Sequence, residues 1–268
     1  MNFINNEYHN LHNVAVNNFD RYVSAKPFPH IVLDNFFNED VLKKIMDEFP
    51  DNLDKIGLDS DSDPQKRKFA LNDFSKFGAN TQNLLNFTNS LKFLNFINKI
   101  SGIKEPLVSD PYFLGGGLHE IKNGGYLNIH SDFNKHHITN LDRRINVLIY
   151  LNPNWKKDYG GSLELWDRDI KKCVTKINPI FNRMVIFDTT DYSFHGNPDP
   201  INHPDKKVSR KSIALYYYSN GRPKEEISGI KDKPQFKNRP NTNDVSENIT
   251  IYKKLFWKIF YKTKTKLY

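Results

Sequence analysis

The sequence is poor in cysteine and in long apolar runs, and each shortage excludes a class of protein. Cys173 is the single cysteine among 268 residues, so no disulfide can form within the chain, which fits a reducing compartment. No stretch reaches the roughly 18 apolar residues that a membrane-spanning helix needs. The first ten residues, MNFINNEYHN, lack the basic and then apolar regions of a secretion signal. We therefore expect a cytoplasmic protein.

Acidic residues are the next shortage, with 31 against 39 basic residues and a net charge of +8. A basic surface can attract nucleic acid, anionic lipid or an acidic substrate. The excess is concentrated at the C-terminus, where no acidic residue follows Glu247. We do not expect nucleic acid as a partner.

In the tail, residues 249–268, apolar positions such as Ile251, Leu255 and Ile259 recur every four residues, with lysines off that stripe. The pattern predicts a basic amphipathic helix. Three roles stay open: packing on the protein's own helices, lying on an anionic membrane surface as a peripheral protein, or binding a partner.

The remaining chain predicts one domain with extensions. We expect a lead-in segment at 1–25, the main domain at 26–222, and a polar linker followed by the basic helix at 223–268. Helical spacing indicates helices at 39–49 and 81–100, while the charged, turn-rich residues 51–80 indicate a loop. From about residue 111 short strands with turn signals predict a sandwich or barrel. They lie near 112–121, 126–131, 144–151, 162–167, 172–178, 183–188 and 210–219.

The segment GGYLNIHSD, residues 124–132, carries the strongest chemical signal. His130 and Asp132 are two residues apart on a predicted strand, so their side chains should point the same way. An imidazole and a carboxylate are two thirds of a 2-His-1-carboxylate site, which suits Fe(II) because it leaves coordination positions open. Strand parity places Tyr126 and Asn128 on the same face. By the same argument Asn146, on the strand at 144–151, is a candidate for the pocket wall.

A third ligand should lie on a later strand. His195 follows an apolar strand and precedes a glycine, whereas His203 lies between proline-rich turns, so we favour His195. Farther on, Arg210 and Ser212 share one face of the last strand. A guanidinium and a hydroxyl that point inward would bind a carboxylate, because arginine can donate two parallel hydrogen bonds to it.

Taken in order, these motifs resemble the Fe(II)- and 2-oxoglutarate-dependent oxygenases, and most closely their prolyl-4-hydroxylase-like branch. The resemblance spans roughly 27–220. It rests on H-x-D at 130–132, RINVLIYLN at 144–152, Trp155, GGSLEL at 160–165, His195 and R-x-S at 210–212, with PFPHIVLD at 27–34 matching the N-terminal strand of that branch.

The resemblance implies an α+β, mainly β fold, a double-stranded β-helix or jelly-roll with N-terminal helices packed on one sheet. It implies His130, Asp132 and His195 as Fe(II) ligands, and Arg210 with Ser212 as the receptor for the distal carboxylate of 2-oxoglutarate. The implied reaction uses dioxygen, hydroxylates a protein side chain, an amino acid or a sugar or glycan intermediate, and releases succinate and carbon dioxide.

Two other classes stay open at this point: a jelly-roll that binds a sugar or a metal without oxidising it, and a cupin-type isomerase. Neither would require Arg210 and Ser212. The substrate, small molecule or protein, is not defined by the motifs.

Overall fold

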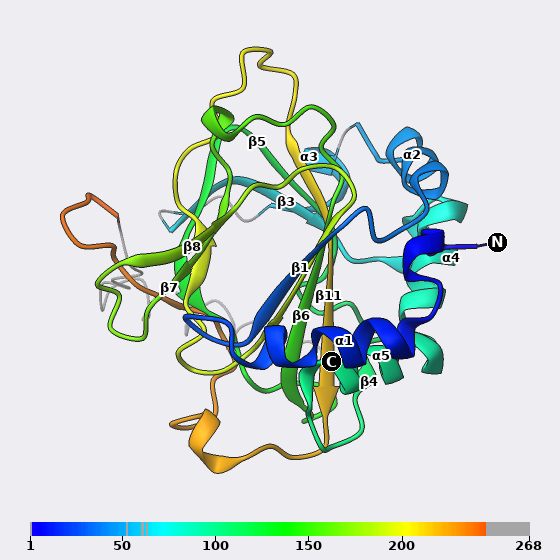
Figure 1. The fold of residues 1–268 in the computed structure, drawn as a ribbon. Coiled ribbons are helices and arrows are strands. Elements are labelled where there is room, and N and C mark those ends of the chain that lie inside the picture. The colour runs from blue at the N-terminus through cyan, green and yellow to red at the C-terminus, as the bar shows by residue number, and fades with distance from the viewer. Residues whose placement is uncertain (1, 52, 60–61, 63, 245–268) are drawn as a thin grey trace, which may run out of the picture.

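A computed structural model describes residues 2–51, 53–59, 62 and 64–244, and within them the chain folds around one curled antiparallel sheet. The main path of this 12-stranded sheet runs β1-β9-β6-β11-β5-β10-β7-β8 (Figure 1). These strands are β1 (His30–Asp34), β5 (Gly117–Ser131), β6 (Asp142–Tyr150), β7 (Leu163–Trp166), β8 (Cys173–Ile177), β9 (Arg183–Asp188), β10 (His195–Asn197) and β11 (Arg210–Ser219). The expected mainly β jelly-roll fold is confirmed.

Four shorter or peripheral strands complete the sheet at its edges. They are β2 (Leu58–Asp59), β3 (Gln65–Leu71), β4 (Val108–Ser109) and β12 (Gln235–Phe236). Both β3 and β12 pair with β5, while β2 pairs with β3 and β4 pairs with β11.

Strand β5 organises the molecule because it is long enough to pair with different neighbours at its two ends. Its first part, from Gly117 to Ile121, pairs with β11, and its last part pairs with β10 through His130. On its other edge β3 covers the first part and β12 the last. Gly124, with φ of 81°, takes a backbone conformation that favours glycine, at the point where the strand changes partners. The H-x-D motif therefore lies where several strands converge.

Helices gather on one side of the sheet (Figure 1). They are α1 (Leu11–Val23), α2 (Glu39–Asp47), α3 (Leu53–Ile56), α4 (Ala79–Thr88) and α5 (Leu91–Ser101), with 3-10 turns η1 (Asn6–Tyr8), η2 (Phe74–Lys76), η3 (Lys157–Tyr159) and η4 (Lys224–Glu226). The helices and the sheet share one apolar core that is rich in phenylalanine, including Phe36, Phe37, Phe93 and Phe96. The N-terminal helices are thus packed on the sheet as expected.

Three elements differ from the sequence-based expectation. The single helix expected at 81–100 is two helices, because Ser90 is extended and caps a new helix at Leu91. Residues 65–71, expected within a loop, form β3, whose last residues are buried against β5. The lead-in segment contains α1, which Asn10 caps with its side chain.

The polar segment after β11 lies against the sheet. Arg222 and Glu226 form an ion pair of 2.7 Å, and β12 adds to β5 beside His130. The predicted basic helix at 249–268 lies outside the described residues. Across the part of the chain that is described, no helix has the length and apolar composition needed to cross a membrane.

Candidate active site

The structure brings His130, Asp132 and His195 together. Their ligand atoms lie within 4.8 Å of one another, and all three side chains are buried. His130 Nε2 lies 3.7 Å from Asp132 Oδ1, and His195 Nε2 lies 3.5 Å from Asp132 Oδ2. His130 lies at the end of β5 and Asp132 directly follows that strand, while β10 places His195 directly opposite His130. The structure thus places His195, and not His203, beside His130 and Asp132.

Both imidazoles are oriented by the backbone two residues before them. His130 Nδ1 lies 2.9 Å from the carbonyl of Asn128, and His195 Nδ1 lies 2.9 Å from the carbonyl of Ser193. A carbonyl can only accept, so Nδ1 carries the proton and the Nε2 lone pair faces the centre of the triad. Burial lowers the pKa of His195 to about 4, which keeps this ring neutral at physiological pH.

Asp132 is held in its ionised form by its neighbours. Asp132 Oδ2 accepts hydrogen bonds from Arg143 at 3.0 Å and from Asn146 at 2.7 Å. Burial alone would raise the pKa of Asp132, but Arg143 and the two histidines outweigh it and hold that pKa well below the usual range. Arg143 itself lies over the ring of Tyr216, with 3.4 Å from its guanidinium carbon to the ring centre.

This donor set fits Fe(II). Two imidazoles and one carboxylate are the donor set of the facial triad of non-haem iron enzymes, and here their ligand atoms lie within 4.8 Å of one another. Carbonyl partners on both histidines and hydrogen bonds on the carboxylate are the outer contacts that orient metal ligands.

The triad lies in a cavity of about 310 Å³ that also contains Arg210. Arg210 is only 5% exposed, and its Nε donates to the carbonyl of Gly161 at 2.8 Å. One of its terminal nitrogens donates to the Tyr150 hydroxyl at 3.2 Å. Among the described residues no carboxylate pairs with Arg210. The cavity therefore contains a buried guanidinium with unused donors and no protein anion to neutralise it.

The other residues predicted for the site fall into two groups. Ser212 and Asn146 line the cavity, as strand parity predicts. Tyr126 and Asn128 are not among its lining residues, although the backbone carbonyl of Asn128 orients His130. His203 lies apart from the triad, beside the rings of Trp155 and Tyr159.

Sequence reasoning missed Arg143, because the pairing of β6 with β11 shifts register there. Tyr217 pairs with Ile145 but Tyr218 pairs with Arg143, so Arg144 is an extra residue. Such a bulge reverses which side chains face inward. Arg143 thus faces Asp132, while Arg144 points away to Glu105 at 2.9 Å.

Two more lining groups were missed because they come from segments expected to be loop and linker. Lys68 on β3 lines the cavity. From the C-terminal segment, Lys233, Pro234 and Phe236 do so as well. The Phe236 ring centre lies 5.2 Å from that of His130. The short apolar run at 69–71 was an available signal for a strand there.

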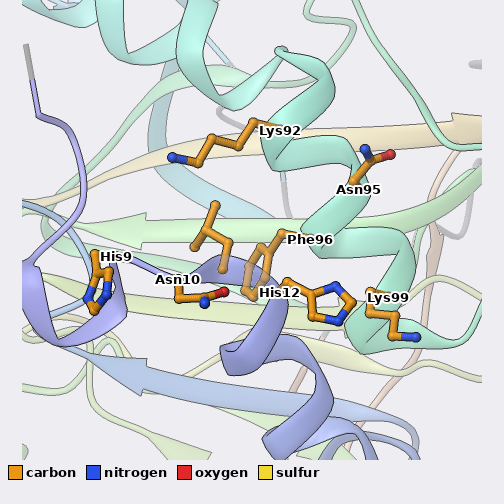
Figure 2. A pocket seen from close by; sticks show the side chains of 8 residues that line it. His9, Asn10, His12, Lys92, Asn95, Phe96 and Lys99 are labelled. Carbon is orange, nitrogen blue, oxygen red and sulfur yellow. The ribbon is translucent and has the colours of Figure 1, made fainter.

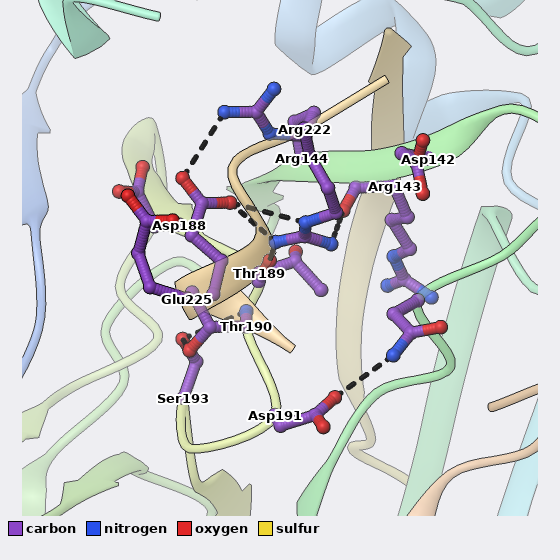
Figure 3. Close-up of polar contacts among 12 residues, drawn as sticks. Asp142, Arg143, Arg144, Asp188, Thr189, Thr190, Asp191, Ser193, Arg222 and Glu225 are labelled. Carbon is purple, nitrogen blue, oxygen red and sulfur yellow. Dashed lines mark hydrogen bonds and ion pairs between the residues drawn. The ribbon is translucent and has the colours of Figure 1, made fainter. Parts of the chain in front are cut away.

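A network of polar contacts fixes this C-terminal segment beside the site (Figure 3). Arg222 donates to the backbone carbonyl of Arg143 at 2.9 Å, and the side chain of the same Arg143 binds Asp132. Asn134 donates to Asp191 at 2.9 Å, and the same Asp191 forms an ion pair with Lys231 at 3.0 Å. Lys233 therefore follows a segment held by Arg222 and Lys231, and it precedes β12, which pairs with β5.

A second cavity, of about 460 Å³, lies between the N-terminal segment and α5 (Figure 2). His9, His12, Lys92 and Lys99 are among its lining residues, and it contains no carboxylate. It shares no residue with the triad cavity, so it is not the site of the iron chemistry.

Comparisons with known proteins agree with this geometry. Residues 116–218 match the family model described as the 2OG-Fe(II) oxygenase superfamily. That span contains the triad and Arg210, so this part of the chain is similar to that superfamily.

Several of the proteins that this chain is similar to are prolyl hydroxylases. Prolyl 3-hydroxylase OGFOD1 of Mus musculus is 35% identical over 80 residues, which are 28% of this chain but only 14% of that protein. Among solved structures, a Pseudomonas putida prolyl-4-hydroxylase has a TM-score of 0.55 at 14% identity, covering 79% of this chain and 100% of that one. A Trichoplax adhaerens prolyl hydroxylase has a TM-score of 0.54 at 19% identity, covering 80% and 91%. At these identities the solved structures establish the fold.

Proposed function

We propose that this protein is an Fe(II)- and 2-oxoglutarate-dependent dioxygenase that hydroxylates a side chain of a protein or peptide. The observation that carries the proposal is the presence, in one cavity, of the metal triad and of Arg210, a buried cation without a protein anion. The first supplies the metal site and the second supplies a receptor for the far carboxylate of 2-oxoglutarate.

The reaction needs both parts. Iron bound at the triad would supply the redox chemistry that couples decarboxylation of 2-oxoglutarate by dioxygen to hydroxylation of a C–H bond. Arg210 and Ser212 would hold the distal carboxylate of the co-substrate. Arginine has five N–H donors, of which two are used by Gly161 and Tyr150, so donors remain for a bidentate pair.

Apolar residues would shield the chemistry from water. Leu148, Leu163 and Phe187 line the cavity on one side, and Phe236 lies against His130. Exclusion of water by these residues would strengthen the ion pair between Arg210 and the carboxylate of 2-oxoglutarate, because electrostatic interactions are stronger where water is excluded.

A peptide substrate is supported by relatives rather than by the triad. The Trichoplax adhaerens enzyme was solved in complex with a peptide fragment of the oxygen degradation domain of hypoxia inducible factor. The structure of this chain and that enzyme share the fold, so we propose the same broad class of target, with residues 26–222 as the catalytic domain.

The test begins with anaerobic Fe(II) and 2-oxoglutarate, which should give a visible charge-transfer band, followed by admission of oxygen and measurement of succinate. His195→Ala should remove both signals. The matched control is His203→Ala, which lies outside the triad and should keep both. A protein that binds the metal but forms no succinate with any substrate would instead be a binding jelly-roll, and the oxygenase proposal would be wrong.

A further inference from the structure

The charge of the cavity wall points to the chemical class of the primary substrate. Among the described residues, four basic side chains line the cavity, those of Lys68, Arg143, Arg210 and Lys233, against the acidic side chain of Asp132. Arg143 is paired with Asp132 at 3.0 Å. Three cations therefore face the cavity without a carboxylate partner among the described residues.

Lys68 is placed in this wall by the register of the sheet. On β5, Ile121 pairs with Arg210 of β11 on one side and with Lys68 of β3 on the other. Directly paired residues of antiparallel strands share a face, so the three side chains form one row across the sheet. With neighbouring strands about 4.8 Å apart, the backbones of Lys68 and Arg210 are separated by roughly 10 Å. The Lys68 and Arg210 side chains can therefore bind two separate anionic groups rather than sharing a single one.

The ammonium group of Lys68 stays available for an incoming anion. Lys68 is half-buried, and burial is the main reason that its pKa falls to about 8, with Asp132 opposing the fall and Arg210 adding to it. It is therefore mostly cationic at neutral pH. Asp132 already accepts two hydrogen bonds on one oxygen and belongs to the metal triad.

Binding of 2-oxoglutarate would not neutralise all the positive charge of the cavity wall. Under the proposed function, 2-oxoglutarate brings two carboxylates, one for Arg210 and one for the metal. Lys68 inside the cavity and Lys233 at its exposed rim are left over. Both lie outside residues 116–218, so they belong to the parts of this chain that the family model does not include.

We propose that the primary substrate carries an anionic group next to the carbon that is hydroxylated, and that Lys68 binds this group while Lys233 attracts it at the rim. The inference rests on the proposed function. A carboxylate and a phosphate have the same receptor chemistry, so the probes below include both.

The experiment measures binding of three capped dipeptide amides to the anaerobic Fe(II)–2-oxoglutarate form of the full chain, through their effect on the charge-transfer band. The probes are Pro-Glu, Pro-phosphoserine and Pro-Gln. At least one acidic probe should bind about tenfold tighter than Pro-Gln, as expected for a partly desolvated charge pair. Lys68→Gln should reduce this preference below about threefold, and Lys233→Gln should reduce it less. The control is Lys92→Gln, an exposed lysine at the other cavity, which should leave it unchanged (Figure 2).

The inference is wrong if the unmodified protein binds acidic and neutral probes equally, or binds no probe at all. It is also wrong if the preference for an acidic probe survives Lys68→Gln. A Lys68→Gln variant that loses 2-oxoglutarate affinity instead would assign Lys68 to the co-substrate. A normal band in the unmodified protein with no preference among probes rejects only this inference. Absence of the band itself would reject the proposed function.

Discussion

Replacing Arg210 by methionine should separate binding of the co-substrate from stability of the fold. The guanidinium is 5% exposed and has polar neighbours, the Gly161 carbonyl and the Tyr150 hydroxyl, but no carboxylate partner in the described structure. Burial lowers its pKa, as expected for a desolvated cation of this kind. Methionine keeps most of the aliphatic length and removes the charge.

The two effects should have different sizes and can have opposite signs. Loss of one partner of a desolvated charge pair costs roughly 2–5 kcal/mol, so the half-saturating concentration of 2-oxoglutarate should rise from about 30-fold to several thousand-fold. Without 2-oxoglutarate the substitution gives up two hydrogen bonds to uncharged oxygens, about 0.5–1.5 kcal/mol each, and removes the cost of a buried charge. We expect the free energy of unfolding to change by less than about 2 kcal/mol.

The assay is titration of the anaerobic Fe(II) protein with 2-oxoglutarate, beside urea unfolding of the metal-free protein. Ser212→Ala is the matched control in the same wall, and should cost only the 0.5–1.5 kcal/mol of an ordinary hydrogen bond. An Arg210→Met protein with unchanged half-saturation would refute the carboxylate-receptor assignment. Severe destabilisation with intact 2-oxoglutarate affinity would show that Arg210 is structural.

Three other predictions concern Asp188, Gly161 and the tail at residues 249–268. Burial raises the pKa of Asp188 to about 7, so its contribution to stability is largest below about pH 4 and falls as pH rises toward 7. Asp188→Asn keeps an acceptor for the Tyr22 hydroxyl and should weaken that decline in urea unfolding between pH 5 and 8. An unchanged pH profile would contradict this prediction. Gly161 has φ of 69°, and a Cβ there would lie 3.1 Å from the Arg210 side chain. Gly161→Ala should therefore cost about 1–2 kcal/mol of stability and weaken 2-oxoglutarate binding. The control is Gly229→Ala, where a Cβ meets open space and neither quantity should change. Deletion of 249–268 should abolish salt-sensitive binding to anionic vesicles if the tail is a membrane-surface helix; a full-length protein that ignores such vesicles at low salt would reject that role.

The sequence indicated the metal site partly through a local signal, because His130 and Asp132 are two residues apart at the end of one predicted strand. His195 follows the apolar strand at 183–188, far along the chain, and the complete ligand set came from the family resemblance. The same local logic located Arg210, whose role in binding 2-oxoglutarate stays a prediction.

The rest of the wall depends on pairing between distant strands. Lys68 faces the cavity only because β3 pairs with β5 in a register that aligns it with Ile121. Phe236 reaches His130 only because β12 adds to the end of β5. Composition made both segments look like exposed chain, although Lys68 and Phe236 line the cavity. A register between distant strands cannot be derived from either segment alone.

The single extra residue in β6 gives two adjacent arginines separate tasks on opposite faces of one strand. Arg143 reaches inward to the metal ligand, and Arg144 reaches outward to Glu226, which also binds Arg222 at the start of the C-terminal segment. The C-terminal segment that lines the cavity is therefore joined, through Arg144 and a single peptide bond, to the arginine that binds Asp132.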